Sequence, residues 1–390
     1  MDEPLARLNL PVRDEAQCAH ALRAAVLPYV DWPRVMNTAR PWIEAVRAQP
    51  APFWAMESLL KEYPISSAEG LALMRLAESL LRVPDTATAM RLTADQLSRA
   101  DFEAHDDRAH PWFANVSAAA IALSKRVLPG DESAGSPSLW QRLGARTVVG
   151  AAVRAVQLLG RQFVFGETIE SAGDRAARMR EHAASLRFSF DMLGEGARTA
   201  ADAQRYHYSY LHAIEHANTR AQGVPTYEAD GVSIKLSALH PRYEEAQRER
   251  VMTELVPRVI ALADAAARGG IPLTIDAEES DRLELSLDVF EAVLREAVRQ
   301  HPHWHGLGLA VQAYQTRAID VVNTVVQLAT THNTRVMMRL VKGAYWDAEI
   351  KRAQERGLSS YPVFTRKVST DVSYLACAER LFSHRDAIYP

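Results

Sequence analysis

The chain has 390 residues, of which 48% are hydrophobic and 24% are charged, and its formal net charge at pH 7 is −3. This composition is typical of a folded globular protein, and the length suits two or three domains or one barrel with a helical extension. The near-neutral charge provides no broad cationic surface for nucleic acid or acidic lipid, so we expect no nucleic-acid partner.

The start of the chain, its cysteines and its hydropathy favour a cytoplasmic protein. Its first residues include acids and lack the apolar core of a secretory signal. Cys18 and Cys377 are the two cysteines, which gives no disulfide framework and suits a reducing compartment. The sequence contains no run of about 18 apolar residues that would cross a membrane.

The first 165 residues are predicted to be almost entirely helical. Stretches rich in Ala, Leu and Arg place apolar residues at a spacing of three to four, which is the repeat of one helix face. Prolines and glycines interrupt this pattern most clearly at 129–137, which is the best candidate for a linker.

Beyond residue 186 short apolar runs alternate with longer amphipathic stretches. This rhythm predicts parallel strands that are joined by crossover helices. The predicted strands are 188–193, 232–236, 273–275, 307–311 and 336–341, and a sixth begins at 387–390. The predicted helices are 201–220, 243–268, 282–299, 316–331 and 347–357. Five strand-and-helix units and the start of a sixth do not close an eight-stranded barrel. We therefore expect either a truncated piece of a barrel or an open sheet.

Four successive runs end in polar side chains, namely Lys235, Asp276, Gln312 and Arg339. The carboxyl ends of parallel strands converge on one mouth in a barrel, and catalytic groups are found there. We therefore expect these four side chains to lie together in a functional site.

The stretch 336–346 is the most informative part of the sequence. It places two cations, Arg339 and Lys342, and two aromatic residues, Tyr345 and Trp346, around Gly343 at the end of a strand. Glycine lets the backbone approach a flat or phosphorylated group, and the cations suit an anionic, planar ligand. The sequence has no GxGxxG pattern, so any dinucleotide must have its phosphates neutralised by Arg and Lys side chains.

The carboxylates near the third strand leave two interpretations open. Asp276, Glu278 and Glu279 could bind a divalent metal, but no His or Cys at ligand spacing accompanies them, and we expect no metal. The alternative is a salt bridge from Asp276 to an Arg or Lys of the barrel. His240, which precedes Pro241, is expected to cap the segment that follows it.

Several long segments match one family in order, among them Ser189-Phe-Asp-Met-Leu-Gly-Glu195 and Arg339-Leu-Val-Lys-Gly-Ala-Tyr-Trp346. The others are 160–168, 233–243, 275–284, 311–315, 361–367 and 370–377. On these residues the chain resembles the proline dehydrogenase portion of the bacterial proline utilization A flavoproteins.

The resemblance implies an α/β fold, a distorted (β/α)8 barrel of TIM type that is incomplete here, with about five to six strands. It divides the chain into a helical dimerisation arm at 1–45, a helical domain at 46–165 and an FAD-binding barrel at 166–390. A homodimer would form through the arm. Because the family's paired carboxylate-binding arginines fall beyond residue 390, we expect the chain to be a piece of a longer protein.

The activity implied by the resemblance is oxidation of L-proline to Δ1-pyrroline-5-carboxylate, by hydride transfer to FAD. The electrons then pass to a quinone at the membrane surface, which requires reversible peripheral contact with the membrane. Full-length relatives also carry an NAD-dependent L-glutamate γ-semialdehyde dehydrogenase domain, so the parent protein is expected to be bifunctional.

The resemblance also implies roles for individual residues. The catalytic residues would be Arg339, Lys235 and Asp276, and proline would contact Lys235, Asp276, Leu340 and Tyr345. The flavin end of the cofactor would be bound by Gln312, Arg339, Val341, Lys342, Gly343, Ala344, Tyr345 and Trp346. Its adenosine end would be bound by Thr365, Arg366 and Lys367.

Two competing functions remain at this point. One is another flavin barrel of the methylenetetrahydrofolate reductase type, which would prefer a folate. The other is a non-catalytic helical scaffold with a relict barrel. Some relatives begin with a ribbon-helix-helix module that binds DNA, but here no basic strand precedes the helical arm, so we expect no transcriptional role.

Overall fold

The computed structural model describes residues 7–8, 11–48, 164–221 and 223–389. The linker predicted at 129–137 and nearly all of the helical domain predicted at 46–165 lie outside these ranges. The chain divides into two compact units, one of Met1–Val35 with Thr168–Pro390 and one of Met36–Glu167. The first unit contains every strand of the described ranges.

Helices make up most of the described residues. The α-helices are α1 (Glu15–Val26), α2 (Trp32–Ala48), α8 (Ile169–His182), α9 (Ala200–Arg220), α10 (Leu236–Leu239), α11 (Arg248–Gly269), α12 (Leu283–Gln300), α13 (Ala318–Thr331), α14 (Trp346–Glu355) and α15 (Lys367–Phe382). Short 3-10 helices cover Leu27–Tyr29, Thr226–Glu228, Glu245–Gln247 and Ser280–Arg282.

The strands of the described ranges form one parallel sheet. They are β1 (Ser189–Asp191), β2 (Gly231–Ile234), β3 (Leu273–Ile275), β4 (Leu307–Gln312), β5 (Val336–Val341) and β6 (Ile388–Tyr389). Each strand pairs in parallel with the next one along the chain, in the order β1-β2-β3-β4-β5-β6. The order never reverses, so the sheet lacks the switch point of a doubly wound fold and is of the barrel type. The α/β class and the parallel strands predicted from the sequence are confirmed.

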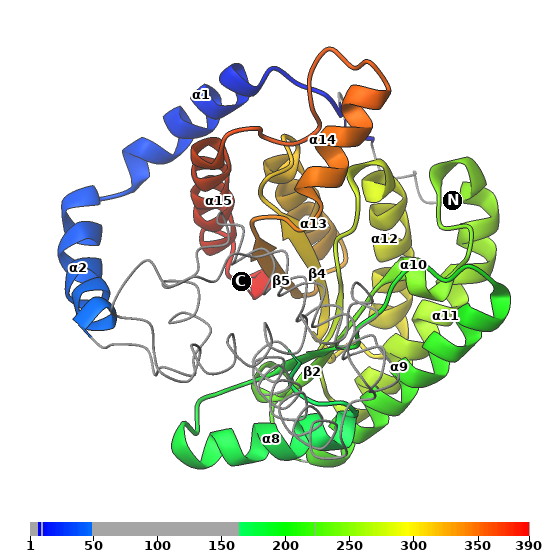
Figure 1. Ribbon diagram of the computed structural model, residues 1–390. Coiled ribbons are helices and arrows are strands. Elements are labelled where there is room, and N and C mark those ends of the chain that lie inside the picture. Colours follow the sequence, from blue (N-terminus) through cyan, green and yellow to red (C-terminus); the bar gives the residue numbers. More distant parts are fainter. Residues whose placement is uncertain (1–6, 9–10, 49–163, 222, 390) are drawn as a thin grey trace, which may run out of the picture. The chain divides into compact units, whose positions relative to one another are not determined.

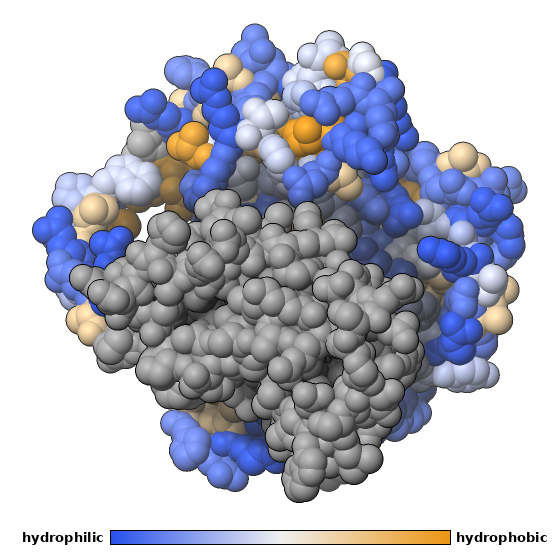
Figure 2. Space-filling view, viewed as in Figure 1, coloured by the Kyte–Doolittle hydropathy of each residue, from blue (hydrophilic) through white to orange (hydrophobic). Residues whose placement is uncertain are grey.

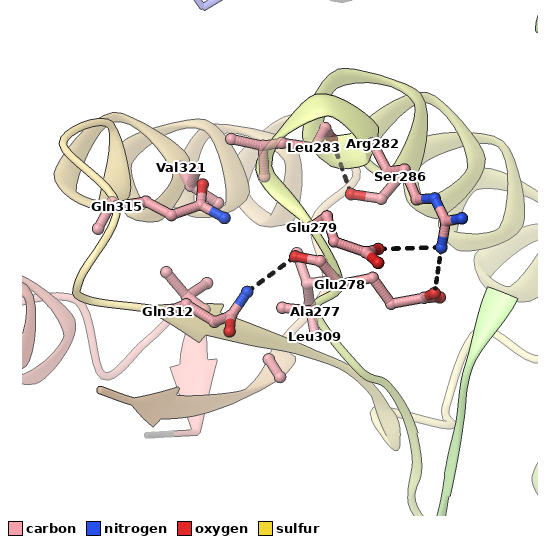
Figure 3. Close-up of a pocket in the computed structure, with 13 residues that line it drawn as sticks. Ala277, Glu278, Glu279, Arg282, Leu283, Ser286, Leu309, Gln312, Gln315 and Val321 are labelled. Carbon is pink, nitrogen blue, oxygen red and sulfur yellow. Dashed lines mark hydrogen bonds and ion pairs between the residues drawn. The ribbon is translucent and has the colours of Figure 1, made fainter. Parts of the chain in front are cut away.

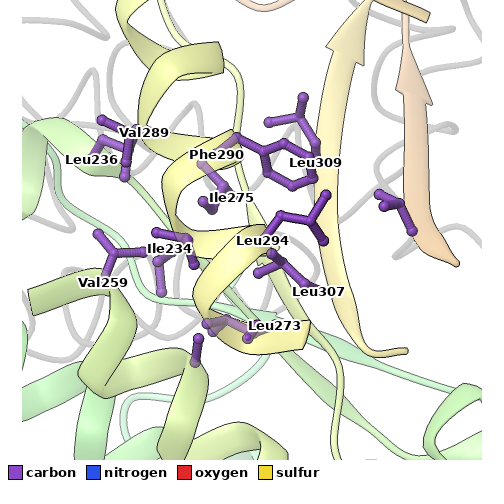
Figure 4. Packing of buried hydrophobic residues seen from close by; sticks show 14 of the residues in the cluster. Ile234, Leu236, Val259, Leu273, Ile275, Val289, Phe290, Leu294, Leu307 and Leu309 are labelled. Atoms are coloured by element: carbon purple, nitrogen blue, oxygen red, sulfur yellow. The ribbon is translucent and has the colours of Figure 1, made fainter. Parts of the chain in front are cut away.

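The two faces of the sheet differ in chemistry, because side chains alternate along each strand. On one face, apolar residues pack against α9, α11, α12 and α13, which lie along one side of the strands (Figure 1). Ile234, Leu273, Ile275 and Phe290 belong to this core and are fully buried (Figure 4). The alternate positions of β1, β2, β3 and β5 carry the polar residues of the candidate site.

Three α-helices of this unit were not predicted, namely α8, α15 and the single-turn α10. The residues that α8 buries are small, Ala172, Gly173 and Ala176, and those of α15 include Ser369 and Ser373. Small and polar buried residues produce no apolar stripe in the sequence, so the helical period is hidden. The capping box at the start of α8, in which Thr168 and Ser171 bond each other's backbone, was the available signal.

Helix α1 packs against α15 and forms a second, smaller core. Leu22 and Val26 of α1 are buried there with Phe364 and Ala376. The N-terminal segment is thereby joined to the last helix of the same unit. Phe364, in the loop that precedes α15, is consequently packed against both α1 and α15.

The surface of the described residues is mostly hydrophilic in the view of Figure 2, with small, separate hydrophobic areas. Among the described residues, no helix is long and apolar enough to cross a membrane.

Shortening a core side chain tests this architecture. Phe290 is fully buried between the sheet and the helices, so Phe290→Ala should lower the free energy of unfolding by about 3–5 kcal/mol through lost burial and a residual cavity. Phe382, which is 54% exposed, is the matched control, and Phe382→Ala should cost about 1 kcal/mol or less. Urea unfolding of both variants measures the difference, and equal losses would contradict this packing.

Candidate active site

A cluster of charged side chains lies at the carboxyl ends of the strands. The Lys235 ammonium, just after β2, is 3.0 and 3.1 Å from the two carboxylate oxygens of Asp191 in β1. It is also 3.0 Å from Oδ2 of Asp276, which follows β3. These contacts use all three protons of the ammonium, so Lys235 is fixed between two carboxylates.

Arg339 of β5 completes the cluster from the other side of Asp276. Its Nη1 donates to Asp276 Oδ1 at 3.1 Å and to the Ser233 hydroxyl at 2.9 Å. Its Nη2 donates to the Ser189 hydroxyl at 2.6 Å. The two serine hydroxyls lie 3.1 Å apart, so β1, β2, β3 and β5 are joined by one polar network.

Burial and charge act against each other in this network. Burial raises the pKa of Asp276 above its ordinary value, while the charges of Lys235 and Arg339 oppose the rise. For Lys235, burial alone would lower the pKa, but the carboxylates of Asp276 and Asp191 raise it above its ordinary value. Lys235 is therefore a permanent cation, and its charge is balanced by its neighbours.

The carboxylates near β3 take part in ion pairs. Asp276 pairs with Lys235 and Arg339, which confirms the predicted salt bridge. Glu278 and Glu279 instead pair with Arg282, at 2.9 and 3.0 Å (Figure 3). The described ranges contain no group of three or more His, Cys, Asp or Glu side chains that could hold a metal ion.

Gln312 at the end of β4 connects the loops after β3 and β5. Its amide nitrogen donates to the Glu278 carbonyl at 2.9 Å (Figure 3), and its amide oxygen accepts from the Ala344 backbone N–H at 3.0 Å. Because Gln312 is 4% exposed, its main contacts are within the protein. One donor and one lone pair of the amide remain for a ligand.

A pocket next to Gln312 does not include the charged cluster. It lies between β4, α12 and α13 and is lined by apolar residues with Glu278, Glu279 and Arg282 (Figure 3). These three charges already pair with one another. We therefore assign no ligand to this pocket.

The turn after β5 leaves backbone exposed beside the cluster. Lys342, Gly343 and Ala344 are all exposed, and Gly343 has φ +148°. A Cβ added at Gly343 would lie 2.4 Å from the Tyr314 ring, so only glycine fits this close approach. Gly343 is thus required at the end of β5 by its close packing against Tyr314.

The remaining residues that were predicted on β5 and at the start of α14 do not all lie on the face of the sheet that carries the charged cluster. Val341 follows Arg339 on the same face of the strand, and Trp346 donates its indole N–H to the Phe364 carbonyl at 3.0 Å. Tyr345 donates its hydroxyl to Glu195 at 3.0 Å. Leu340 instead packs against the apolar core on the opposite face, so the structure does not bring it into the charged cluster.

The residues predicted at the adenosine end lie at the start of α15. Thr365 donates its backbone N–H and its hydroxyl to the Glu15 carboxylate of α1, at 2.9 and 2.6 Å, and the Arg366 N–H donates to it at 3.2 Å. Asp371 pairs with Lys342 at 2.5 Å and with Lys367 at 2.7 Å. The residues predicted at the flavin end, after β5, and those predicted at the adenosine end, at the start of α15, are therefore joined by the ion pairs of Asp371.

These features fit an elongated anionic ligand with a planar ring. The exposed turn at Gly343 and the Arg339 guanidinium suit the ring. The cations Lys342 and Lys367, which are 52% and 79% exposed, suit phosphates. The Glu15 carboxylate already accepts from the backbone N–H groups of Thr365 and Arg366 and from the Thr365 hydroxyl.

Four residues of the site were not assigned from the sequence. Ser189, Asp191 and Ser233 belong to the polar network, and Glu195 accepts from Tyr345. The period-two alternation from Ser189 to Asp191 and from Ser233 to Lys235 was the signal that could have found three of them.

Comparisons with known families match two parts of the chain. Residues 173–390 match the family model described as "Proline dehydrogenase". Residues 55–163 match the one described as "DNA-binding domain of Proline dehydrogenase", and they lie outside the described ranges. The second match contradicts our expectation of no nucleic-acid partner. That expectation rested largely on net charge, which averages over the chain and does not report on one segment.

Individual relatives agree with the first match. The chain is 47% identical over 339 residues to the "Bifunctional protein PutA" of Klebsiella aerogenes, covering 86% of this chain and 26% of that one. It is 45% identical over 353 residues to the PutA of Rhizobium meliloti, covering 88% and 28%. A crystal structure of a mutant proline utilization A from Bradyrhizobium japonicum is similar with a TM-score of 0.70 and 44% identity, covering 100% of this chain and 38% of that one. The chain spans about a quarter of the length of these curated relatives.

Replacing the connecting amide tests the arrangement of the two loops. Gln312→Leu leaves the Glu278 carbonyl and the Ala344 N–H without partners, which should cost about 2 kcal/mol or more in stability. Hydrogen exchange at the Ala344 amide should become faster, because its acceptor is gone. Gln300→Leu on the exposed side of α12 is the control and should change neither quantity. Unchanged exchange at Ala344 in the Gln312 variant would show that the connection is unimportant.

Proposed function

The chain belongs to the proline dehydrogenase family, and from this premise we propose that it catalyses the FAD-dependent oxidation of L-proline to Δ1-pyrroline-5-carboxylate. The observation that carries the proposal is the Arg339 guanidinium, which Asp276 and two serines hold at the carboxyl ends of the strands. Those contacts use three of its five N–H groups, which leaves two for a ligand.

FAD, when bound, would accept the two electrons that leave proline with the hydrogen on C5. Arg339 supports this chemistry because it stays charged and presents a planar fork to a ring on which negative charge develops. Asp276 orients Arg339 rather than acting as a strong base, since it already pairs with two cations. Gln312, Val341, Gly343, Ala344 and Trp346 would line the ring, while Lys342, Thr365, Arg366 and Lys367 would hold the phosphates and the adenosine end.

We place the substrate against Lys235, Asp276 and Tyr345. The proline amine must be neutral before C5 can be oxidised, and a partly buried site disfavours its charged form. Lys235 is 15% exposed and Asp276 is 14% exposed, so these two side chains are largely screened from water. Leu340 keeps its proposed contact with proline only if the end of β5 turns its side chain out of the core.

The wider activity of the full-length protein is also a proposal, because this chain covers a quarter of its curated relatives. We propose that the electrons pass to a membrane quinone during reversible peripheral contact with the membrane. An NAD-dependent L-glutamate γ-semialdehyde dehydrogenase in the same protein would then use the product. The relatives named bifunctional support this arrangement.

A homodimer through the segment 1–45 is the corresponding proposal for assembly. Helix α2 carries several large apolar side chains that are exposed, among them Met36, Trp42, Ile43 and Val46. Such a helix face suits burial against another surface.

Removing the Arg339 charge tests the proposed reaction. In the full-length protein loaded with FAD, Arg339→Met should lower kcat/KM for proline at least about 100-fold, because a fixed group that stabilises developing charge is lost. The measurement is proline-dependent reduction of a dye, with flavin absorbance recorded for each variant.

Arg299→Met is the matched control, since Arg299 is 68% exposed and pairs with Glu296 far from the cluster. It should retain full activity. Wild-type protein that holds flavin but oxidises 5-methyltetrahydrofolate instead of proline would refute the proposed substrate. Full proline oxidation by the Arg339 variant would refute the proposed role of Arg339.

A further inference from the structure

The loop that precedes α15 is held by two different sets of contacts. In its buried first half, the Phe364 N–H donates to the Tyr314 carbonyl at 2.7 Å, and the Thr316 N–H donates to the Pro362 carbonyl at 3.0 Å. Tyr314 and Thr316 both follow β4, so the barrel itself fixes this half. The second half, residues 365–367, is exposed and depends on a different partner.

That partner is Glu15, the first residue of α1. Its Oε2 accepts from the Thr365 N–H at 2.9 Å and from the Thr365 hydroxyl at 2.6 Å, and its Oε1 accepts from the Arg366 N–H at 3.2 Å. Burial acts to raise the pKa of Glu15, but hydrogen bonds from Thr365, Ser369 and Arg366 bring it below its ordinary value. The carboxylate is therefore ionised at neutral pH, and its charge suits the positive end of the 16-residue helix α15.

Glu15 is held in turn by the rest of the N-terminal segment. Arg13 pairs with Asp320 of α13 at 2.6 Å, and the Ser360 hydroxyl donates to the Arg13 carbonyl at 3.1 Å. Farther along α1, apolar side chains are buried with Phe364 and a residue of α15. Because a docked helix presents the acceptor, Glu15 orders the exposed half of the loop before any ligand arrives, which lowers the cost of binding there.

We propose that Glu15 is a positioning residue for the adenosine end of the cofactor, because it fixes the backbone from which Thr365, Arg366 and Lys367 present their side chains. The inference rests on the proposed function, in which these three residues bind that end. The Arg366 and Lys367 side chains are exposed and carry charges that suit phosphates, whereas Glu15 acts through the loop. The flavin end, beside Arg339, does not depend on this contact.

The first test needs neither activity nor added cofactor. In the full-length protein, hydrogen exchange of the peptides that contain residues 364–366 is followed by mass spectrometry. Glu15→Gln, which keeps the size of the side chain but removes its charge, should make the Thr365 and Arg366 amides exchange about tenfold faster. The Phe364 amide, whose acceptor is Tyr314, should keep its rate.

The matched control is Asp14→Asn, which removes the same charge from the neighbouring position. Asp14 accepts the Gln17 N–H at 2.7 Å within the N-terminal segment itself. Exchange at residues 364–366 should therefore stay at the wild-type rate in this variant.

The second test measures how tightly the cofactor is held. The same full-length variants are loaded with FAD and diluted, and release is followed by the recovery of flavin fluorescence. Glu15→Gln should release FAD about tenfold faster, because the loop must then be ordered by the ligand, and Asp14→Asn should release it at the wild-type rate. With FAD kept in excess, kcat for proline should stay within about twofold of wild type in both variants, since the Arg339 cluster is unchanged.

The outcomes separate this inference from the proposed function. Wild-type protein that holds FAD but does not oxidise proline would remove the proposed activity, while the exchange and release results would still report on Glu15. Equal exchange at Thr365 and Arg366 in the wild type and in Glu15→Gln would overturn the inference, as would an unchanged rate of FAD release. Slower release from Glu15→Gln would overturn it too, because Glu15 would then compete with the cofactor.

Discussion

The Asp276 carboxylate, shared between Lys235 and Arg339, is the interaction on which the candidate site depends. A partly buried carboxylate is unfavourable unless it is paired, and here each oxygen has its own cation. The polar network around this carboxylate requires the sheet to be curved. Four strand spacings separate β1 from β5, which would be roughly 19 Å in a flat sheet, too far for a side chain to bridge. Yet Arg339 of β5 donates to Ser189 of β1 at 2.6 Å. The polar network and the barrel-like curvature therefore support each other.

The two faces of the sheet have different roles, one in stability and the other in the orientation of charged side chains. The outer face has buried apolar residues such as Ile234, Leu273 and Ile275, which stabilise the fold through packing against helices. The inner face has charges that contribute little net stability, because the loss of hydration offsets their attraction. What the inner face provides is orientation: Arg339 is held in one direction, with two N–H groups remaining for a ligand.

Much of this site was predictable because it follows strand ends. Lys235, Asp276, Gln312 and Arg339 each end an apolar run, and parallel strands bring such ends together. Asp191 was not assigned, because in the three residues of β1 the alternation from Ser189 to Asp191 is a signal of a single period. The family resemblance placed Leu340 against proline, whereas in the structure its side chain packs against the apolar core, on the face of β5 opposite to that of Arg339.

Other features needed the three-dimensional structure. The contact of Glu15 with Thr365 joins residues 350 positions apart, and no local pattern predicts it. Helix α15 was missed because its buried face is built largely from small residues. The nucleic-acid expectation was wrong because it used the charge of the whole chain, whereas the matching segment covers residues 55–163.

In the proposed reaction one carboxylate, that of Asp276, fixes the Arg339 cation beside a redox-active ring. The most direct measurement is a crystal structure of the full-length protein with FAD and a proline analogue bound. We predict that Asp276 stays within ion-pair distance of both Lys235 and Arg339, and that a free N–H of Arg339 faces the ring. An Arg339 side chain that leaves Asp276 and extends into solvent, with the ring bound elsewhere, would contradict the account.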